Sequence, residues 1–163
     1  MKKILLVFCL ALPLLLSCSD DNDKFDIVGT WVADGVEIIE IETDSPESEI
    51  LVRQYILDEE EKDKEKSIIF MNDRTGNLVY KDGSKLRLAY ALYYDILSIG
   101  KLENGQSFLQ ESELRNKTKN SFVSYGNILR QSSANIFEEY PELKDIDIKK
   151  LHIEYKYKRV VDK

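Results

Sequence analysis

The stretch just before the carboxyl end constrains the fold most, because its side chains alternate between apolar and polar over residues 151–158. The apolar positions are Leu151, Ile153, Tyr155 and Tyr157, and the polar positions between them are His152, Glu154, Lys156 and Lys158. A repeat of two residues is the repeat of a β-strand, whose side chains point to opposite faces. One face of this strand is therefore expected to lie on a core while the other meets water.

A second alternating run covers residues 86–96. Its apolar positions are Leu86, Leu88, Tyr90, Leu92, Tyr94 and Ile96. The apolar positions then shift by one residue to Leu97 and Ile99. An extra residue in a strand produces such a shift, so the sequence predicts a bulge or bend near Asp95.

Turn-forming dipeptides separate the apolar runs. Asp82-Gly83 joins a strand that ends at Tyr80 to one that begins near Lys85, and Asn104-Gly105 joins the next pair. Both dipeptides tolerate the positive φ angles of two-residue hairpins. The residues from Asn72 to Gly76 mark a further turn. The sequence therefore predicts a mainly β chain with short antiparallel connections.

Two segments are candidates for helices. Residues 127–140 place apolar side chains at helical spacing, and Pro141 would end that helix. Residues 46–62 could form a second helix, capped by Ser45 and with proline at its first position. The apolar side chains of residues 50–57 fit equally well the second arm of a hairpin that begins with residues 36–43. We favour the helix.

The amino end has the features of an export signal. Lys2 and Lys3 precede an apolar run, Ile4 to Leu16, that is shorter than the roughly 20 residues a membrane-spanning helix needs. Leu15-Leu16-Ser17-Cys18 resembles the lipobox of bacterial lipoproteins. That resemblance implies cleavage before Cys18 and acylation of its thiol, so that residues 1–17 are a cleaved signal peptide.

An acidic segment follows the cysteine. Ser19-Asp20-Asp21-Asn22-Asp23 resembles the tag that directs lipoproteins of Bacteroidota to the cell surface. This implies an outer membrane lipoprotein, displayed on the surface or else on the periplasmic face. We expect residues 18–26 to be a tether and residues 27–163 to be the folded domain.

The charge of the processed chain limits its partners. Without residues 1–17 the chain has 146 residues, with 21 basic and 30 acidic side chains and a net charge of −9. Such a chain is a poor candidate for binding nucleic acid or an anionic membrane. Cys9 leaves with the signal and Cys18 would carry lipid, so no cysteine remains for a disulfide. The domain must be held by its core.

Three short motifs resemble lipocalins and the lipocalin-like lipoproteins of Bacteroidota. Gly29-Thr30-Trp31 resembles the Gly-x-Trp signature, residues 70–76 resemble the strand and turn that follow it, and residues 155–160 resemble the closing strand. The resemblance implies a small antiparallel β-barrel or barrel-like sheet. Together with the segments predicted above, this gives a mainly β fold with one or two short helices, in which the helix over residues 127–140 departs from the simplest form of that barrel.

Arg159 offers an independent test of that resemblance. Alternation places it on the inward face with Tyr155 and Tyr157, where an unsatisfied charge would be costly. In lipocalins an arginine from a late strand covers the signature tryptophan. We therefore predict that Arg159 lies over Trp31, which brings the two ends of the chain together. The alternative is that the strand frays after Tyr157 and Arg159 is solvated.

The sequence offers little catalytic chemistry. His152 is the only histidine and falls on the polar face of its strand. The carboxylates of residues 37–49 and the charged run 58–66 are best explained as solvated surfaces. No nucleophile elbow, paired-histidine zinc motif or phosphate-binding glycine loop is present. We expect a protein that is not an enzyme and has no metal or cofactor.

Two functions follow, from different classes. The first is binding of a small apolar or amphipathic ligand inside a barrel or cup. The lining residues would be Tyr90, Leu92, Tyr94, Ile153, Tyr155 and Tyr157. The second is a surface interaction or inhibitor module whose acidic face, residues 37–49 with 58–65, engages a protein of unknown identity. Tyr93 falls on the outer face, as a strand surface residue or a stacking platform for a sugar.

Overall fold

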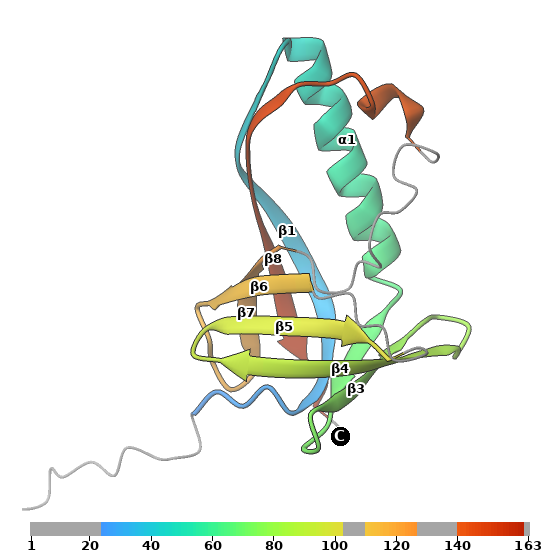
Figure 1. The fold of residues 1–163 in the computed structure, drawn as a ribbon, viewed down its shortest axis with the longest axis vertical. Coiled ribbons are helices and arrows are strands. Elements are labelled where there is room, and N and C mark those ends of the chain that lie inside the picture. The colour runs from blue at the N-terminus through green and yellow to red at the C-terminus, as the bar shows by residue number, and fades with distance from the viewer. Residues whose placement is uncertain (1–23, 103–109, 127–139, 162–163) are drawn as a thin grey trace, which may run out of the picture.

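In the part of the chain that the structure describes, eight antiparallel strands close into one barrel, with one α-helix beside it (Figure 1). The computed structural model describes residues 24–102, 110–126 and 140–161. The signal segment, Cys18, the Asn104-Gly105 turn and residues 127–139 of the first predicted helix lie outside the described residues. Within them, the predicted fold class is confirmed: a small, mainly β, lipocalin-like antiparallel barrel.

Each strand pairs with the next in sequence, and β8 returns to pair with β1. The strands are β1 (Gly29–Thr43), β2 (Ser67–Phe70), β3 (Thr75–Val79), β4 (Lys85–Tyr93), β5 (Ile96–Lys101), β6 (Gln110–Arg115), β7 (Ser121–Tyr125) and β8 (Ile148–Arg159). The helices are α1 (Pro46–Asp63) and the short 3-10 helix η2 (Pro141–Leu143). Closure pairs the strand edges within the barrel. Among the described residues, β2 pairs with β1 only as far as Val32, and β7 pairs with β8 only from Glu154 onward. The predicted turns at Asn72–Gly76 and Asp82-Gly83 are confirmed.

The longest strands, β1 and β8, continue past the barrel as a two-stranded ribbon (Figure 1). In it residues 36–43 of β1 pair with residues 148–155 of β8. The register shifts at three places, between Ala33 and Gly35, between Ile38 and Glu40, and between Glu42 and Thr43. Such bulges increase twist and bend a ribbon. Here the bent ribbon carries the helix.

Helix α1 begins where the sequence predicts it. The Ser45 side chain accepts a hydrogen bond from the Ser48 amide at 3.1 Å, and Pro46 occupies the first turn. Val52, Tyr55 and Ile56 are buried against the ribbon together with Leu143 of η2. The predicted helix over residues 46–62 is confirmed, and the alternative of a hairpin arm is wrong. The cap and the apolar contact with the ribbon decide the outcome.

Side chains of the barrel fill its interior. The buried cluster contains aromatic residues from five strands and aliphatic residues between them: Trp31, Ile68, Phe70, Leu78, Leu88, Tyr90, Leu97, Ile99, Leu114, Phe122, Tyr155 and Tyr157. Phe122 lies edge-on to Trp31 at 4.7 Å between ring centroids and stacks on Tyr157 at 4.9 Å. Eight-stranded barrels are just wide enough to be packed in this way.

Arg159 lies over Trp31, as predicted. The guanidinium carbon is 4.5 Å from the centroid of the indole ring. The Trp31 side chain is fully buried, and its Nε1 donates to the Ile27 carbonyl at 2.7 Å. Arg159 also donates to the carbonyls of Lys119 at 2.9 Å, of Val28 at 2.7 Å, and of Asp26. The charge is therefore satisfied, and the strand does not fray before Arg159.

The predicted bulge near Asp95 is wrong. Tyr93 pairs with Ile96, so Tyr94 and Asp95 form a two-residue hairpin turn between β4 and β5. Tyr94 has a φ of 52°, a value that two-residue turns require and that glycine or asparagine usually supplies. A turn that reverses the strand direction also shifts the apolar positions, which is why it resembled a bulge in the sequence.

A substitution at Gly29 tests whether the packing of Arg159 stabilises the closed barrel. The φ of Gly29 is 139°, and a Cβ placed there would collide with the Arg159 guanidinium. We expect Gly29→Ala to lower the free energy of unfolding by about 2–4 kcal/mol, through backbone strain and displaced hydrogen bonds. Gly83→Ala is the matched control, because Gly83 also has a positive φ but faces open space. It should cost about 1 kcal/mol in urea unfolding. Equal losses would contradict the proposed role of Arg159.

Candidate functional site

The two ends of the barrel differ in their surroundings. Successive strands run in opposite directions, so the turns at residues 71–74, 94–95 and 116–120 lie at one end, with residues 24–28. We call this the closed end, because Trp31 and Arg159 fill it. The connection from α1 to β2 and the β3–β4 hairpin lie at the opposite end, which we call the mouth.

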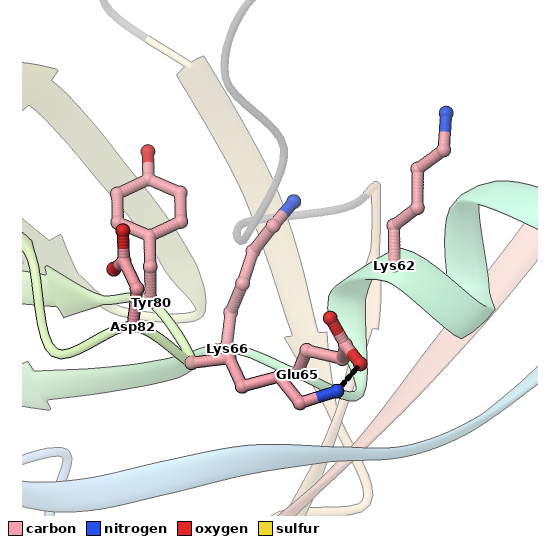
Figure 2. A pocket seen from close by; sticks show the side chains of 6 residues that line it. Lys62, Glu65, Lys66, Tyr80 and Asp82 are labelled. Carbon is pink, nitrogen blue, oxygen red and sulfur yellow. Dashed lines mark hydrogen bonds and ion pairs between the residues drawn. The ribbon is translucent and has the colours of Figure 1, made fainter.

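A depression of about 630 Å³ lies at the mouth (Figure 2). It is formed by the end of α1, the connection to β2 and the β3–β4 hairpin. Its lining residues are Lys62, Glu65, Lys66, Tyr80, Lys81 and Asp82. This volume lies within the roughly 300–1,000 Å³ of ordinary small-molecule sites. Figure 2 shows Lys62, Lys66 and Tyr80 extending to the same side of the depression.

Lys66 and Tyr80 occupy inward positions at the edge of the barrel. Ser67 pairs with Val79, so the residues just outside that pair stand opposite each other. Lys66 lies two residues before the buried Ile68, and Tyr80 lies two residues after the buried Leu78. The Tyr80 ring packs against the barrel core. Tyr80 is therefore the one aromatic residue that lines the depression, and the other five lining residues are charged.

The lysines of the depression are held by nearby carboxylates. Lys66 lies 2.8 Å from Asp63, whose carboxylate is almost completely buried. Lys62 contacts Glu59 at 3.1 Å and lies near the Tyr140 hydroxyl at 3.4 Å, and Lys81 pairs with Glu65. Both charge signs therefore line the rim. Such a rim can exchange ion pairs for contacts with the polar group of a ligand.

Five of the six predicted lining residues lie inside the molecule. Tyr90, Tyr155 and Tyr157 belong to the barrel cluster, Leu92 packs against it, and Ile153 packs against both this cluster and the one under α1. They fill the interior in this structure, and a role in ligand binding remains a prediction for them.

Tyr94 does not line the interior. It is 80 % exposed at the closed end, in the turn between β4 and β5. The alternation that placed it inside ends at Tyr93, because the chain reverses there. The prediction for Tyr94 is wrong, and its neighbour Tyr93 is also exposed, at 72 %.

His152 lies on the outer face of β8, as alternation predicts. Its Nε2 is 3.5 Å from Glu154, and its ring meets the edge of Tyr125 at 5.0 Å. Arg115 bridges Glu154 at 3.0 Å and Glu113 at 2.8 Å. The Arg115 hydrogen bond lowers the pKa of Glu113. This cluster is a cross-strand network of ion pairs on the outside of the sheet, without a nucleophile among its members.

The acidic residues of the ribbon do not form a bare acidic face. Glu37 pairs with Lys156 at 2.8 Å, and Glu40 and Glu42 both contact Lys150, at 3.1 and 3.3 Å. The hydrogen bond and charge of Lys156 lower the pKa of Glu37. On α1, Glu49 pairs with Arg53, and Glu60 and Glu61 with Lys64. Cross-strand and i,i+4 geometry thus neutralises many of these charges locally.

The fold and the mouth define a class: a small closed antiparallel barrel with a polar-rimmed depression at one end. No family model, no curated protein and no solved structure matches the chain. In the described part of the chain, no group of three or more histidine, cysteine or acidic residues could hold a metal ion. Nor is any helix there long and apolar enough to cross a membrane.

Sequence reasoning missed the residues of the mouth. The sequence pattern predicts a solvated charged run for Lys62, Glu65 and Lys66, and for Tyr80 only the end of a strand. A signal was available, because alternation from Ile68 and Leu78 places Lys66 and Tyr80 on the inner face. The position of α1 beside them depends on the bent ribbon, which no local pattern predicts.

The protonation of Tyr90 makes the stability of the fold depend on pH in the alkaline range. The Tyr90 hydroxyl donates to the Met71 carbonyl at 2.7 Å. Burial, and then the charges of Asp26 and Asp73, raise the pKa of Tyr90 above its usual 10.0. The folded chain therefore holds this proton more tightly than the unfolded chain. The resulting stability is present below pH 10 and is lost as the pH rises through the folded-state pKa.

We expect Tyr90→Phe to lower the free energy of unfolding by about 1 kcal/mol at neutral pH, because the Met71 carbonyl loses the Tyr90 hydroxyl and keeps only the Arg74 amide as a donor. The difference from the unchanged chain should shrink above pH 10, measured by urea unfolding over a pH series. Tyr93→Phe, at an exposed ring, is the control and should show neither effect. A difference that grows with pH would contradict the assignment.

Proposed function

We propose that this protein is a lipid-anchored, non-catalytic protein of the cell envelope that binds a small amphipathic ligand at the mouth of its barrel. The observation that carries the proposal is the depression at the mouth, where the Tyr80 ring, which packs on the barrel core, lies among five charged residues. Small-molecule sites usually combine apolar walls with a few polar groups, and here Tyr80 supplies the apolar contact. The apolar part of the ligand would contact Tyr80, and its polar group would meet the lysines and carboxylates of the rim.

The closed end of the barrel is a poorer candidate for the ligand site than the mouth, as judged from the described residues. The rings of Trp31, Phe122 and Tyr157 contact one another there, and Arg159 lies over Trp31. We therefore propose that a ligand enters at the mouth. The alternative function, protein binding through an acidic face, lacks support of this kind because basic side chains pair with many of those carboxylates.

The lipid anchor rests on the resemblance of residues 15–18 to a lipobox, and the kinship with lipocalin-like lipoproteins rests on the three motifs described above. Acylation of Cys18 would attach the chain to the outer membrane. One acyl chain binds a membrane only marginally, at about 0.8 kcal/mol per buried methylene, so more than one chain is expected on the cysteine. We propose display on the cell surface, which protease treatment of intact cells would test.

Ligand binding is tested with the Cys18→Ala chain and the apolar fluorophore N-phenyl-1-naphthylamine. We expect saturable enhancement of fluorescence, and at least about tenfold weaker binding for Tyr80→Ala, equivalent to ~1.4 kcal/mol. The loss of aromatic contact at the pocket floor is the reason. Tyr93→Ala, at the closed end, is the matched control and should bind like the parent chain.

Two further measurements test ligand binding at the mouth. Native mass spectrometry of the Cys18→Ala chain, purified from cells of its source, should reveal a retained small molecule. Urea unfolding of Tyr80→Ala establishes that the variant is folded. No enhancement and no retained molecule, or equal binding by Tyr80→Ala, would overturn ligand binding at the mouth.

The lipid anchor makes a separate prediction. Cys18→Ala should abolish the added mass of acyl chains in intact-mass spectra. Cys9→Ala is the matched control and should keep that mass, since this residue lies in the apolar run of the signal and is expected to be removed with it. Acyl mass that persists in the Cys18→Ala chain would contradict lipid attachment at this residue.

A further inference from the structure

Two neighbouring tyrosines are exposed at the closed end of the barrel. Tyr93 is 72 % and Tyr94 is 80 % exposed, and their rings meet edge-to-face at 4.5 Å between centroids. Ile96, on the same hairpin, is 40 % exposed. We call Tyr93 and Tyr94 the tyrosine tip. Its rings contact each other and project from the turn, and packing of the barrel does not require them there.

The backbone of the tip favours a different residue. Tyr94 adopts a φ of 52°, a conformation that glycine or asparagine adopts at lower energy than a tyrosine. The turn would therefore form more readily without an aromatic side chain at this position. A residue that is unfavourable for its backbone and unused by the core points to a role at the surface.

The tip lies beside the point where the chain leaves toward Cys18. Lys117 pairs with Asp95, the second residue of the turn, and its ammonium also lies 5.8 Å from the centroid of the Phe25 ring. Phe25 in turn packs on Trp31 at 6.0 Å. Figure 1 shows residues 24–28 at the same end of the barrel as the β4–β5 turn. These contacts join the tip to the base of the tether.

The tether is too short to let the tip move far from its anchor. Cys18 precedes Lys24 by six residues, which span at most roughly 20 Å when fully extended. An anchored chain therefore keeps its closed end close to the lipid surface. The mouth, at the opposite end of the barrel, is then turned toward water.

The chemistry of the tip suits the headgroup region of a bilayer. Tyrosine combines an apolar ring with a hydroxyl and is enriched at membrane interfaces. The one charge in the turn, on Asp95, is paired with Lys117. The negative charge of this chain disfavours contact with anionic lipid. A neutral aromatic tip does not need anionic lipid, because it can enter the headgroup region of an uncharged membrane.

We propose that the tyrosine tip docks into the headgroup region of the membrane that carries the lipidated Cys18, with the mouth of the barrel facing away from that membrane. This inference rests on the lipid attachment proposed above. A sugar or a protein that covers the tip instead is an alternative occupant, and the experiment below separates it from the membrane.

The experiment uses the full lipidated chain in phosphatidylcholine vesicles whose acyl chains are brominated, because bromine quenches tryptophan emission at short range. Tyr94→Trp places a reporter at the tip, and Leu57→Trp places one on α1, where Leu57 is 47 % exposed. The unchanged chain supplies the baseline, since Trp31 is fully buried. We expect loss of emission and a blue shift for Tyr94→Trp, and neither for Leu57→Trp.

Flotation of the vesicles on a density gradient gives an independent measure of attachment. A chain that floats while Tyr94→Trp remains unquenched overturns the docking, and leaves the tip for a sugar or protein partner. Equal quenching of both reporters overturns the proposed orientation. A chain that does not float overturns lipid attachment, and the docking with it. Tyr93→Trp repeats the test without altering the residue at positive φ.

Discussion

The contact of Arg159 with Trp31 joins the two ends of the folded chain. The guanidinium covers the indole and donates to backbone carbonyls of Asp26, Val28 and Lys119, which come from the amino end and from the β6–β7 turn. A stacked arginine of this kind contributes about 0.5–2 kcal/mol, and its hydrogen bonds add to that. Gly29 leaves the space that the guanidinium occupies. The same contacts of Arg159 therefore both join the ends of the barrel sheet and fill the closed end.

Filling one end determines what the rest of the molecule can do. A barrel that is packed by its own side chains can admit a ligand only where the strands extend beyond the core. In this chain β1 and β8 extend past the other strands, and α1 packs on that extension. The end of α1 then stands beside the β3–β4 hairpin and forms a wall of the mouth. The depression is thus a consequence of unequal strand lengths.

Much of this arrangement follows from local sequence patterns. Alternation predicts β8 and its buried face, glycine-containing dipeptides predict the β3–β4 turn, and Ser45 with Pro46 predicts the start of α1. The position of Arg159 over Trp31 follows from alternation together with the resemblance to lipocalins. Each of these predictions depends on a few residues that are close together in the sequence. Their residue types strongly favour one backbone conformation, or strongly favour burial over exposure.

The errors have equally specific causes. The β4–β5 turn uses tyrosine at a positive φ, so its sequence lacks the usual turn signal and resembles a continuing strand. The length of the ribbon and its bulges depend on pairing between residues more than 100 positions apart. The mouth combines a helix end with a distant hairpin, and most of its residues are charged. No periodic pattern distinguishes such residues from an ordinary solvated surface.

Charge at the level of composition is a poor guide to charge at the level of a surface. The acidic excess of this chain suggested an acidic face, yet strand pairing places Lys150 and Lys156 beside the carboxylates of β1. Helical spacing likewise places Arg53 and Lys64 beside those of α1. Exposed pairs of this kind contribute little stability, because water screens their charges. Their larger effect is to place a cation beside these carboxylates, so that this part of the surface carries both charge signs although the chain as a whole is negative.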